Sequence, residues 1–90
     1  SGSYSVKKNR VKSEIDLRGM DSEEAKYEVD IYLDSATLNG YQEVFLIHGK
    51  GSGVLRKTIQ KHLKESPYVE NFRIGNANEG GLGVTVAKLK

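Results

Sequence analysis

The chain has 90 residues, of which 37% are hydrophobic and 29% are charged, a composition typical of one globular domain with a modest core. It contains no cysteine, which excludes a disulfide framework and a thiolate metal site. No apolar run is long enough to span a bilayer and no signal-peptide core is found. We therefore expect a cytoplasmic protein without a membrane partner.

The net charge of +2 is distributed unevenly along the chain. Residues 1–13 carry four bases and no acid, residues 14–43 carry nine acids against two bases, and residues 44–90 carry eight bases against three acids. Basic segments of this kind favour a polyanionic partner. The first segment is polar and aperiodic, so we expect a flexible basic linker that serves as a solvated tether rather than as an arm on phosphates. It begins Ser-Gly-Ser without Met, as in a fragment cut from a larger protein.

The first predicted strand covers residues 14–18, where apolar and charged residues alternate. Ile15 and Leu17 face the core, and Asp16 and Arg18 lie side by side on the opposite face. Asp21 followed by Glu24 predicts the start of a helix. The buried stripe of that helix is Ala25, Val29, Tyr32, Leu33 and Ala36, and Gly40 ends it. Its exposed side is acidic, which is typical of a solvated face.

Residues 43–47 form a continuous apolar run, which predicts a second strand buried on both faces. A second helix is expected over residues 53–66, with Leu55, Ile59 and Leu63 facing inward and Pro67 ending it. Its polar side is basic, and two interpretations remain open: a solvated face or a track for phosphates. His62 flanks the apolar stripe, as packed boundary residues do.

The last part of the chain predicts two further strands. Residues 69–74 form the third strand, residues 75–81 a mobile loop and residues 82–89 the fourth strand. The fourth strand carries little charge, so it suits a central place in the sheet.

Residues 48–53, His-Gly-Lys-Gly-Ser-Gly, connect the second strand to the second helix. Alternate glycines permit positive φ and leave room for a ligand, and the unpaired N–H groups of the helix point into the same turn. With Lys50 and His48 present, the turn predicts an anion site, for which phosphate is the natural ligand. The spacing fits neither a Walker A loop nor a dinucleotide fingerprint. The simpler alternative is a glycine-rich connection that only turns the chain.

The order β-α-β-α-β-β predicts an α/β two-layer sandwich. Right-handed crossovers place both helices on one face of a four-stranded mixed sheet, and the last strand enters between the second and third to give the order 1-2-4-3. The carboxyl ends of the first three strands then share one edge, where open α/β sheets bind ligands. Asp16, Arg18, the turn at 48–53 and the loop at 76–83 should meet there.

Three stretches resemble the Smr (small MutS-related) domain: Ile-Asp-Leu-Arg-Gly at 15–19, His-Gly-Lys-Gly-Ser-Gly-Val-Leu-Arg at 48–56 and Gly-Gly-Leu-Gly-Val-Thr-Val at 80–86. The similarity covers about residues 14–89, and we expect the domain to occupy residues 14–90. With Tyr-Leu-Asp-Ser-Ala at 32–36, it points to the version at the C-terminus of the second bacterial MutS paralogue. The resemblance implies a fold like the C-terminal domain of translation initiation factor three, nucleic-acid binding and, in several members, a DNA-nicking endonuclease activity.

The resemblance also implies a parent protein that is a dimeric ATPase, with ATP and the dimer contacts in domains absent from this chain. That protein is linked to suppression of homologous recombination and, in some bacteria, to rescue of collided ribosomes. The partner would therefore be DNA, branched DNA included, or ribosomal RNA.

The site residues follow from the resemblance and from the turn. The expected catalytic residues are His48, which would activate water or protonate the leaving oxygen, Asp16 and Arg18. The expected phosphate-binding residues are Lys50, Gly49, Gly51, Ser52, Gly53, Arg56 and Lys57. Many family members have His where this chain has Arg18, and Arg cannot act as a base at neutral pH.

Two alternatives to a nuclease remain open. The first is a binding module without chemistry, and the second is a protein-docking domain that uses the acidic first helix. A single carboxylate at this edge of the sheet gives little support to a two-metal mechanism. We therefore expect no tightly bound metal and at most a weakly bound Mg²⁺ or Mn²⁺.

Overall fold

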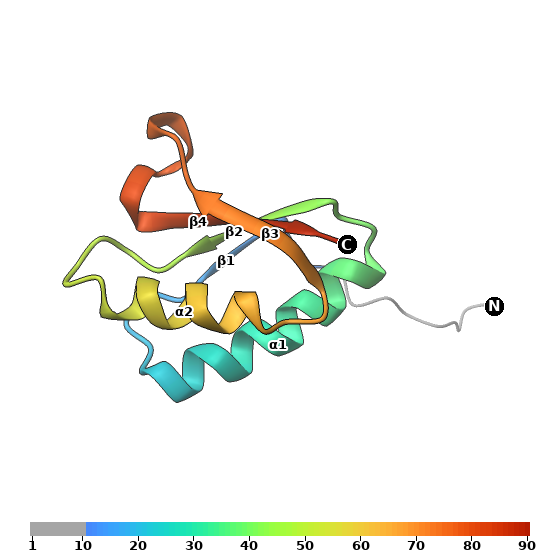
Figure 1. Cartoon of the computed structure of the whole chain (residues 1–90), viewed down its shortest axis with the longest axis horizontal. Helices are drawn as coiled ribbons and strands as arrows, with labels where there is room; N and C mark the ends of the chain where they lie inside the picture. Colours follow the sequence, from blue (N-terminus) through green and yellow to red (C-terminus); the bar gives the residue numbers. More distant parts are fainter. Residues whose placement is uncertain (1–10) are drawn as a thin grey trace.

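The computed structural model describes residues 11–90, which form a four-stranded mixed sheet with two α-helices on one face (Figure 1). The strands are β1 (Glu14–Asp16), β2 (Glu43–Ile47), β3 (Val69–Ile74) and β4 (Val84–Leu89). Their order is β1-β2-β4-β3, with β1 parallel to β2 and β4 antiparallel to both of its neighbours. The predicted architecture and strand order are confirmed.

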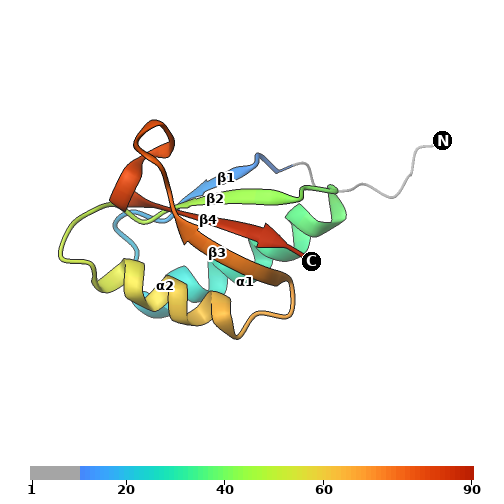
Figure 2. The same cartoon turned by 45° about the horizontal axis from the view of Figure 1, so that its top comes forward.

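Helices α1 (Ser22–Leu38) and α2 (Val54–Lys64) run side by side beneath the sheet (Figures 1 and 2). The core lies between them and the sheet, and the stripe predicted for α1 is buried there. Asp21 caps α1 as predicted, because its carboxylate accepts a hydrogen bond of 2.8 Å from the backbone N–H of Glu24. No helix within residues 11–90 is both long and apolar enough to cross a membrane.

Several element boundaries differ from the prediction. Strand β2 is fully buried only on the helix side, at Val44 and Leu46, while Phe45 and Ile47 are half-buried. The prediction of burial on both faces is wrong because the two helices cover one face only. Strand β1 stops two residues before its predicted end, β4 starts two residues after its predicted start, and α2 spans a shorter range than expected.

The loop before β4, predicted to be mobile, is folded into two short 3₁₀ helices, η1 (Ala77–Glu79) and η2 (Gly81–Gly83). The side chain of Asn76 accepts from the backbone of Glu79, and the Glu79 carboxylate accepts from the backbone N–H of Asn76 at 2.7 Å. Arg73 adds two hydrogen bonds to the same carboxylate, at 2.8 and 3.1 Å. These bonds hold the turn against β3.

The first ten residues of the predicted N-terminal linker lie outside the described part of the chain. Its last three residues contact the fold. The Tyr41 hydroxyl donates to the carbonyl of Val11 at 2.8 Å, and the Tyr32 hydroxyl donates to the carbonyl of Lys12 at 2.6 Å. Residues 11 and 12 therefore pack against the domain that is predicted to start at residue 14.

Candidate functional site

Three distant segments meet where β1 and β2 end. The backbone N–H groups of His48 and Gly49 both donate to the carbonyl of Gly83, at 3.0 and 2.9 Å. Gly49 has φ +82°, and a Cβ added to it would lie 3.3 Å from Cγ of Arg18. Only glycine allows both this conformation and this approach without strain. The predicted convergence at one edge of the sheet is thus confirmed, and we call this edge the rim.

The rim contains a hollow of about 420 Å³ that is open to solvent. Its lining is Gly19, Met20, Asp21, Ser22, His48, Gly49, Lys50, Gly51, Ser52, Gly53, Val54, Leu55 and Arg56. The lining therefore joins the end of the β1 segment, the start of α1, the glycine turn and the start of α2.

Both helices begin at this hollow, but their N-termini differ. The N-terminus of α1 is closed by the Asp21 carboxylate and followed by Glu23 and Glu24. The N-terminus of α2 has Gly53 at its cap position, with φ +88°, no side-chain cap and no acid in the first turn. Its N–H groups and its positive dipole end are therefore open to an external anion. The N–H of Val54 has only a long contact of 3.4 Å to the Ser52 hydroxyl.

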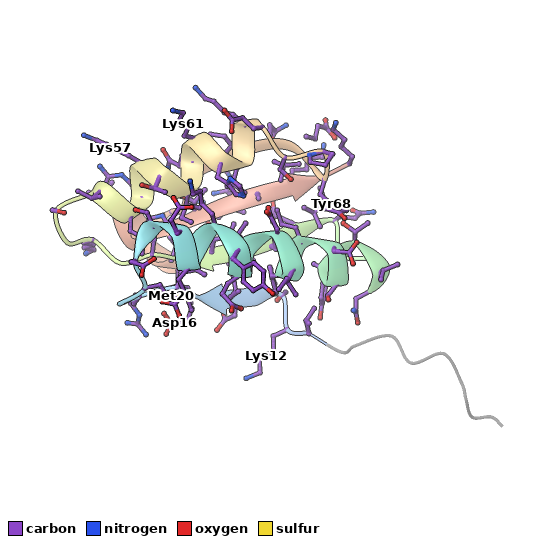
Figure 3. All side chains as sticks on the ribbon, turned by 90° about the horizontal axis from the view of Figure 1, so that it is seen from below. Lys12, Asp16, Met20, Lys57, Lys61 and Tyr68 are labelled. Carbon is purple, nitrogen blue, oxygen red and sulfur yellow. The ribbon has the colours of Figure 1, made fainter. Side chains whose placement is uncertain are left out.

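Lys50 and Arg56 supply positive charge beside this helix start. A Cβ added to Gly53 would lie 3.0 Å from Nη2 of Arg56, so the guanidinium reaches back over the turn. In Figure 3, Lys57 extends outward from α2 at the upper left, and Asp16 lies at the lower left beside β1. Seven of the ten predicted site residues thus line the hollow, while Asp16, Arg18 and Lys57 do not. Arg18 lies beside the turn, next to Gly49.

Asp16 and Arg18 form a two-pronged ion pair on the surface. Nε and Nη2 of Arg18 donate to the two carboxylate oxygens at 2.9 and 2.7 Å, and the Arg18 backbone N–H adds a third bond at 3.0 Å. Hydrogen bonds from the Arg18 side chain and backbone lower the pKa of Asp16 to about 2. Asp16 is therefore ionised at neutral pH and fixes the direction of the guanidinium.

His48 is buried, with 5% of its surface exposed, and both ring nitrogens have partners. Nδ1 lies 3.0 Å from the carbonyl oxygen of Gly49, and Nε2 lies 2.7 Å from Oγ1 of Thr85. Burial lowers the pKa of His48, so the imidazole is neutral at pH 7. Its role as the general base stays a prediction; the geometry supports a role in holding the turn.

The residues that surround His48 were not predicted from the sequence. Thr85 is fully buried in β4, and Nε2 of Gln60 donates to its hydroxyl oxygen at 3.1 Å. One signal was available: a single hydroxyl inside the apolar run 84–87 must find a hydrogen-bond partner once buried. The carbonyl of Gly83 carried no signal, because any residue has one.

No group of three or more His, Cys, Asp or Glu side chains within residues 11–90 is arranged to hold a metal ion. The expectations about metals and cofactors therefore stay predictions.

Comparison with known proteins supports the resemblance. A family model described as the Smr domain matches residues 15–90. A protein named endonuclease MutS2 from Fusobacterium nucleatum is 61% identical over 84 residues, which are 93% of this chain and 11% of that protein. One of the same name from Clostridium botulinum is 58% identical over 81 residues, or 90% of this chain and 10% of that protein. The chain thus spans about a tenth of the length of these curated relatives.

Two solved structures share the fold. The crystal structure of the Smr domain of Thermus thermophilus MutS2 aligns with a TM-score of 0.83 and 44% identity, covering 86% of this chain and 96% of that one. YdaL, a stand-alone small MutS-related protein from Escherichia coli, aligns with a TM-score of 0.82 and 24% identity, covering 87% and 64% of the two chains. At that identity, the second match shows the fold alone.

Proposed function

The chain belongs to the Smr domain family, and on that basis we propose that it binds DNA through backbone phosphates at the rim and nicks it. It would act as one module of a larger MutS2-like endonuclease that suppresses homologous recombination. The observation that carries this proposal is the hollow of about 420 Å³ at the open N-terminus of α2. Relatives named as endonucleases add support for the chemistry.

The hollow suits a phosphate for electrostatic reasons. The side chains of Lys50 and Arg56, which line it, form no ion pair with another residue of the described chain. The N–H groups of residues 50–53 likewise have no protein acceptor within the range 11–90. A phosphate site is built from backbone N–H donors and unpaired cationic side chains that line the same hollow. Contacts of this kind bind the phosphate backbone and do not select a base sequence. Recognition would therefore follow the shape of the nucleic acid.

Groups in the hollow, together with Arg18 beside the turn, would stabilise the transition state of phosphodiester hydrolysis. Negative charge develops on the phosphate oxygens as water attacks, and fixed N–H donors, Lys50 and Arg18 would offset it. Asp16 holds Arg18 in place through the two-pronged pair. His48 fixes the turn that presents the N–H groups.

Binding is tested with Lys50→Glu, with Lys64→Glu as the matched control. Both substitutions change the net charge by the same amount, but Lys64 lies in the last turn of α2, away from the rim. We expect Lys50→Glu to abolish binding to a labelled DNA duplex and Lys64→Glu to retain it. The slope of log affinity against log salt should become shallower by roughly 0.9 for each phosphate that the protein no longer neutralises. Equal binding by both variants would place the nucleic acid elsewhere.

Cleavage is tested by relaxation of supercoiled plasmid DNA with the wild-type chain, Arg18→Ala and His48→Ala. Circular dichroism must first show that each variant is folded. We expect Arg18→Ala to bind the plasmid but nick it slowly, because the charge-stabilising group is gone. Nicking at the wild-type rate by both folded variants would point to a contaminating nuclease.

A second candidate function is binding without cleavage, as in a module that grips ribosomal RNA during rescue of collided ribosomes. It is favoured by the contacts of His48, the expected base, and of Asp16 in the described structure. Nε2 of His48 lies 2.7 Å from Oγ1 of Thr85, and both carboxylate oxygens of Asp16 accept hydrogen bonds from Arg18. Co-sedimentation with ribosomes, set beside binding to DNA junctions and linear duplex, separates the two candidates.

A further inference from the structure

Three side chains form a hydrogen-bonded line that runs from α2 through β4 to the glycine turn. Nε2 of Gln60 lies 3.1 Å from Oγ1 of Thr85, and that oxygen lies 2.7 Å from Nε2 of His48. Nδ1 of His48 lies 3.0 Å from the carbonyl oxygen of Gly49. Gln60 and Thr85 do not line the hollow at the rim, so they act on it only through His48.

The donors along this line follow from chemistry. A carbonyl oxygen can only accept, so Nδ1 of His48 carries the proton toward Gly49. In a neutral ring Nε2 is then an acceptor, so the Thr85 hydroxyl must donate to it. The hydroxyl oxygen keeps a lone pair for the Gln60 amide. With this assignment each contact along the line joins one donor to one acceptor, and no buried side-chain nitrogen or oxygen within residues 11–90 lacks a hydrogen-bond partner.

Holding the Gly49 carbonyl in one direction also fixes the direction of the Lys50 backbone N–H. The peptide bond is planar and no cis peptide occurs among the described residues, so the carbonyl of Gly49 and the N–H of Lys50 point in opposite directions. The carbonyl is turned toward the imidazole, which leaves the Lys50 N–H directed away from it. That N–H has no protein acceptor within residues 11–90 and is free to donate to an anion.

We propose that Gln60 and Thr85 are positioning residues that hold His48 as the Nδ1-protonated tautomer, so that the Gly49–Lys50 peptide presents its N–H to phosphate. The other tautomer would set the lone pair of Nδ1 against the carbonyl oxygen of Gly49. Repulsion between them would turn the carbonyl toward the hollow, where it would oppose an anion. The inference rests on the proposed phosphate site and names the residues that keep it in its binding form.

The tautomer is read directly from the ¹⁵N chemical shifts of the His48 ring at neutral pH. We expect a protonated Nδ1 and a bare Nε2 in the wild-type chain. Gln60→Glu supplies an acceptor where the amide donated, so the Thr85 hydroxyl turns to the new carboxylate. Nε2 of His48 should then carry a proton. A wild-type ring with its proton on Nε2, or a ring unchanged by Gln60→Glu, would overturn the proposal.

The functional consequence is tested with Thr85→Val, which keeps the shape and removes the hydroxyl, and with Thr85→Ser, which restores it. We expect Thr85→Val to bind a labelled DNA duplex roughly tenfold more weakly, as when one charge-assisted hydrogen bond is weakened. Thr85→Ser should bind nearly as wild type. A merely structural role would lower the unfolding temperature without changing the ring ¹⁵N shifts.

Lys50→Glu separates failure of this inference from failure of the proposed function. If Lys50→Glu abolishes binding while folded Thr85→Val binds as wild type, the phosphate site stands and the positioning role is refuted. If Lys50→Glu still binds, the phosphate site itself is refuted. Should Thr85→Val fail to fold, the ¹⁵N shifts of Gln60→Glu still decide the tautomer assignment.

Discussion

Replacing Gly80 by alanine tests how firmly the turn before β4 is tied to the sheet. Gly80 has φ +108°, and a Cβ added there would overlap Cγ2 of Val84. Val84 cannot move aside, because it is buried, branched at Cβ and paired with Ile47 in the sheet. Backbone strain of about 1–3 kcal/mol adds to overpacking of about 1–3 kcal/mol, so the loss is roughly 2–6 kcal/mol. A domain of this size has about 5–13 kcal/mol in total.

Gly81→Ala is the matched control for this measurement. Gly81 has φ +56° and nothing within 4 Å of an added Cβ, so only the left-handed conformation opposes the substitution. That conformation costs about 1–2 kcal/mol, and each kcal/mol lowers Tm by about 4–8 °C. Overpacking of about 1–3 kcal/mol affects only the Gly80 variant. In thermal unfolding followed by circular dichroism, we therefore expect it to melt at least about 4 °C below the Gly81 variant. Equal melting temperatures would refute the described contact with Val84.

The same substitution should also weaken the site. Gly83, three residues beyond Gly80, accepts the hydrogen bonds from His48 and Gly49. If the turn shifts to relieve the clash, these two bonds lengthen and the glycine turn loses its anchor. We therefore expect the Gly80 variant to bind DNA more weakly even below its melting temperature.

Two other predictions concern acid stability and the N-terminal contact. An NMR titration should give Asp16 a pKa of about 2, returning toward 3.8 in Arg18→Ala. Because the pKa in the folded state lies below its ordinary value, the stability from this pair is present above about pH 4 and is lost as pH falls toward about 2. An ordinary pKa in the wild type would contradict the pair. Tyr32→Phe removes the 2.6 Å bond to Lys12 and should lower the free energy of unfolding in urea by about 1 kcal/mol; an unchanged value would show that the bond is absent in solution.

The sequence was a good guide wherever local signals decide the structure. The bounds of β2 and β3 agree with the prediction, because each is a short apolar or alternating run with a glycine close behind it. The start of α1 followed from Asp21, since an N-cap acts within three residues. The central place of β4 followed from its low charge. The glycine turn could be recognised because the spacing of its glycines and the start of the helix after it are both encoded by residues close together in the sequence.

Features set by distant partners could not be predicted in the same way. The burial of His48 depends on Thr85, 37 residues away, and on a glycine carbonyl that has no sequence signature. Order in the loop before β4 depends on Glu79 pairing with Arg73 of the previous strand. The pairing of Asp16 with Arg18 was visible from their spacing, but its two-pronged geometry was not.

The position of β4 bears on how the domain forms during synthesis. This strand is the last element of the domain to be translated, yet it joins β2 to β3 at the centre of the sheet. Until it emerges from the ribosomal exit tunnel, β3 has no partner and the glycine turn lacks the carbonyl of Gly83. Nascent chains stalled before residue 84 should thus remain sensitive to protease, and the anion site should arise only in the final step of folding.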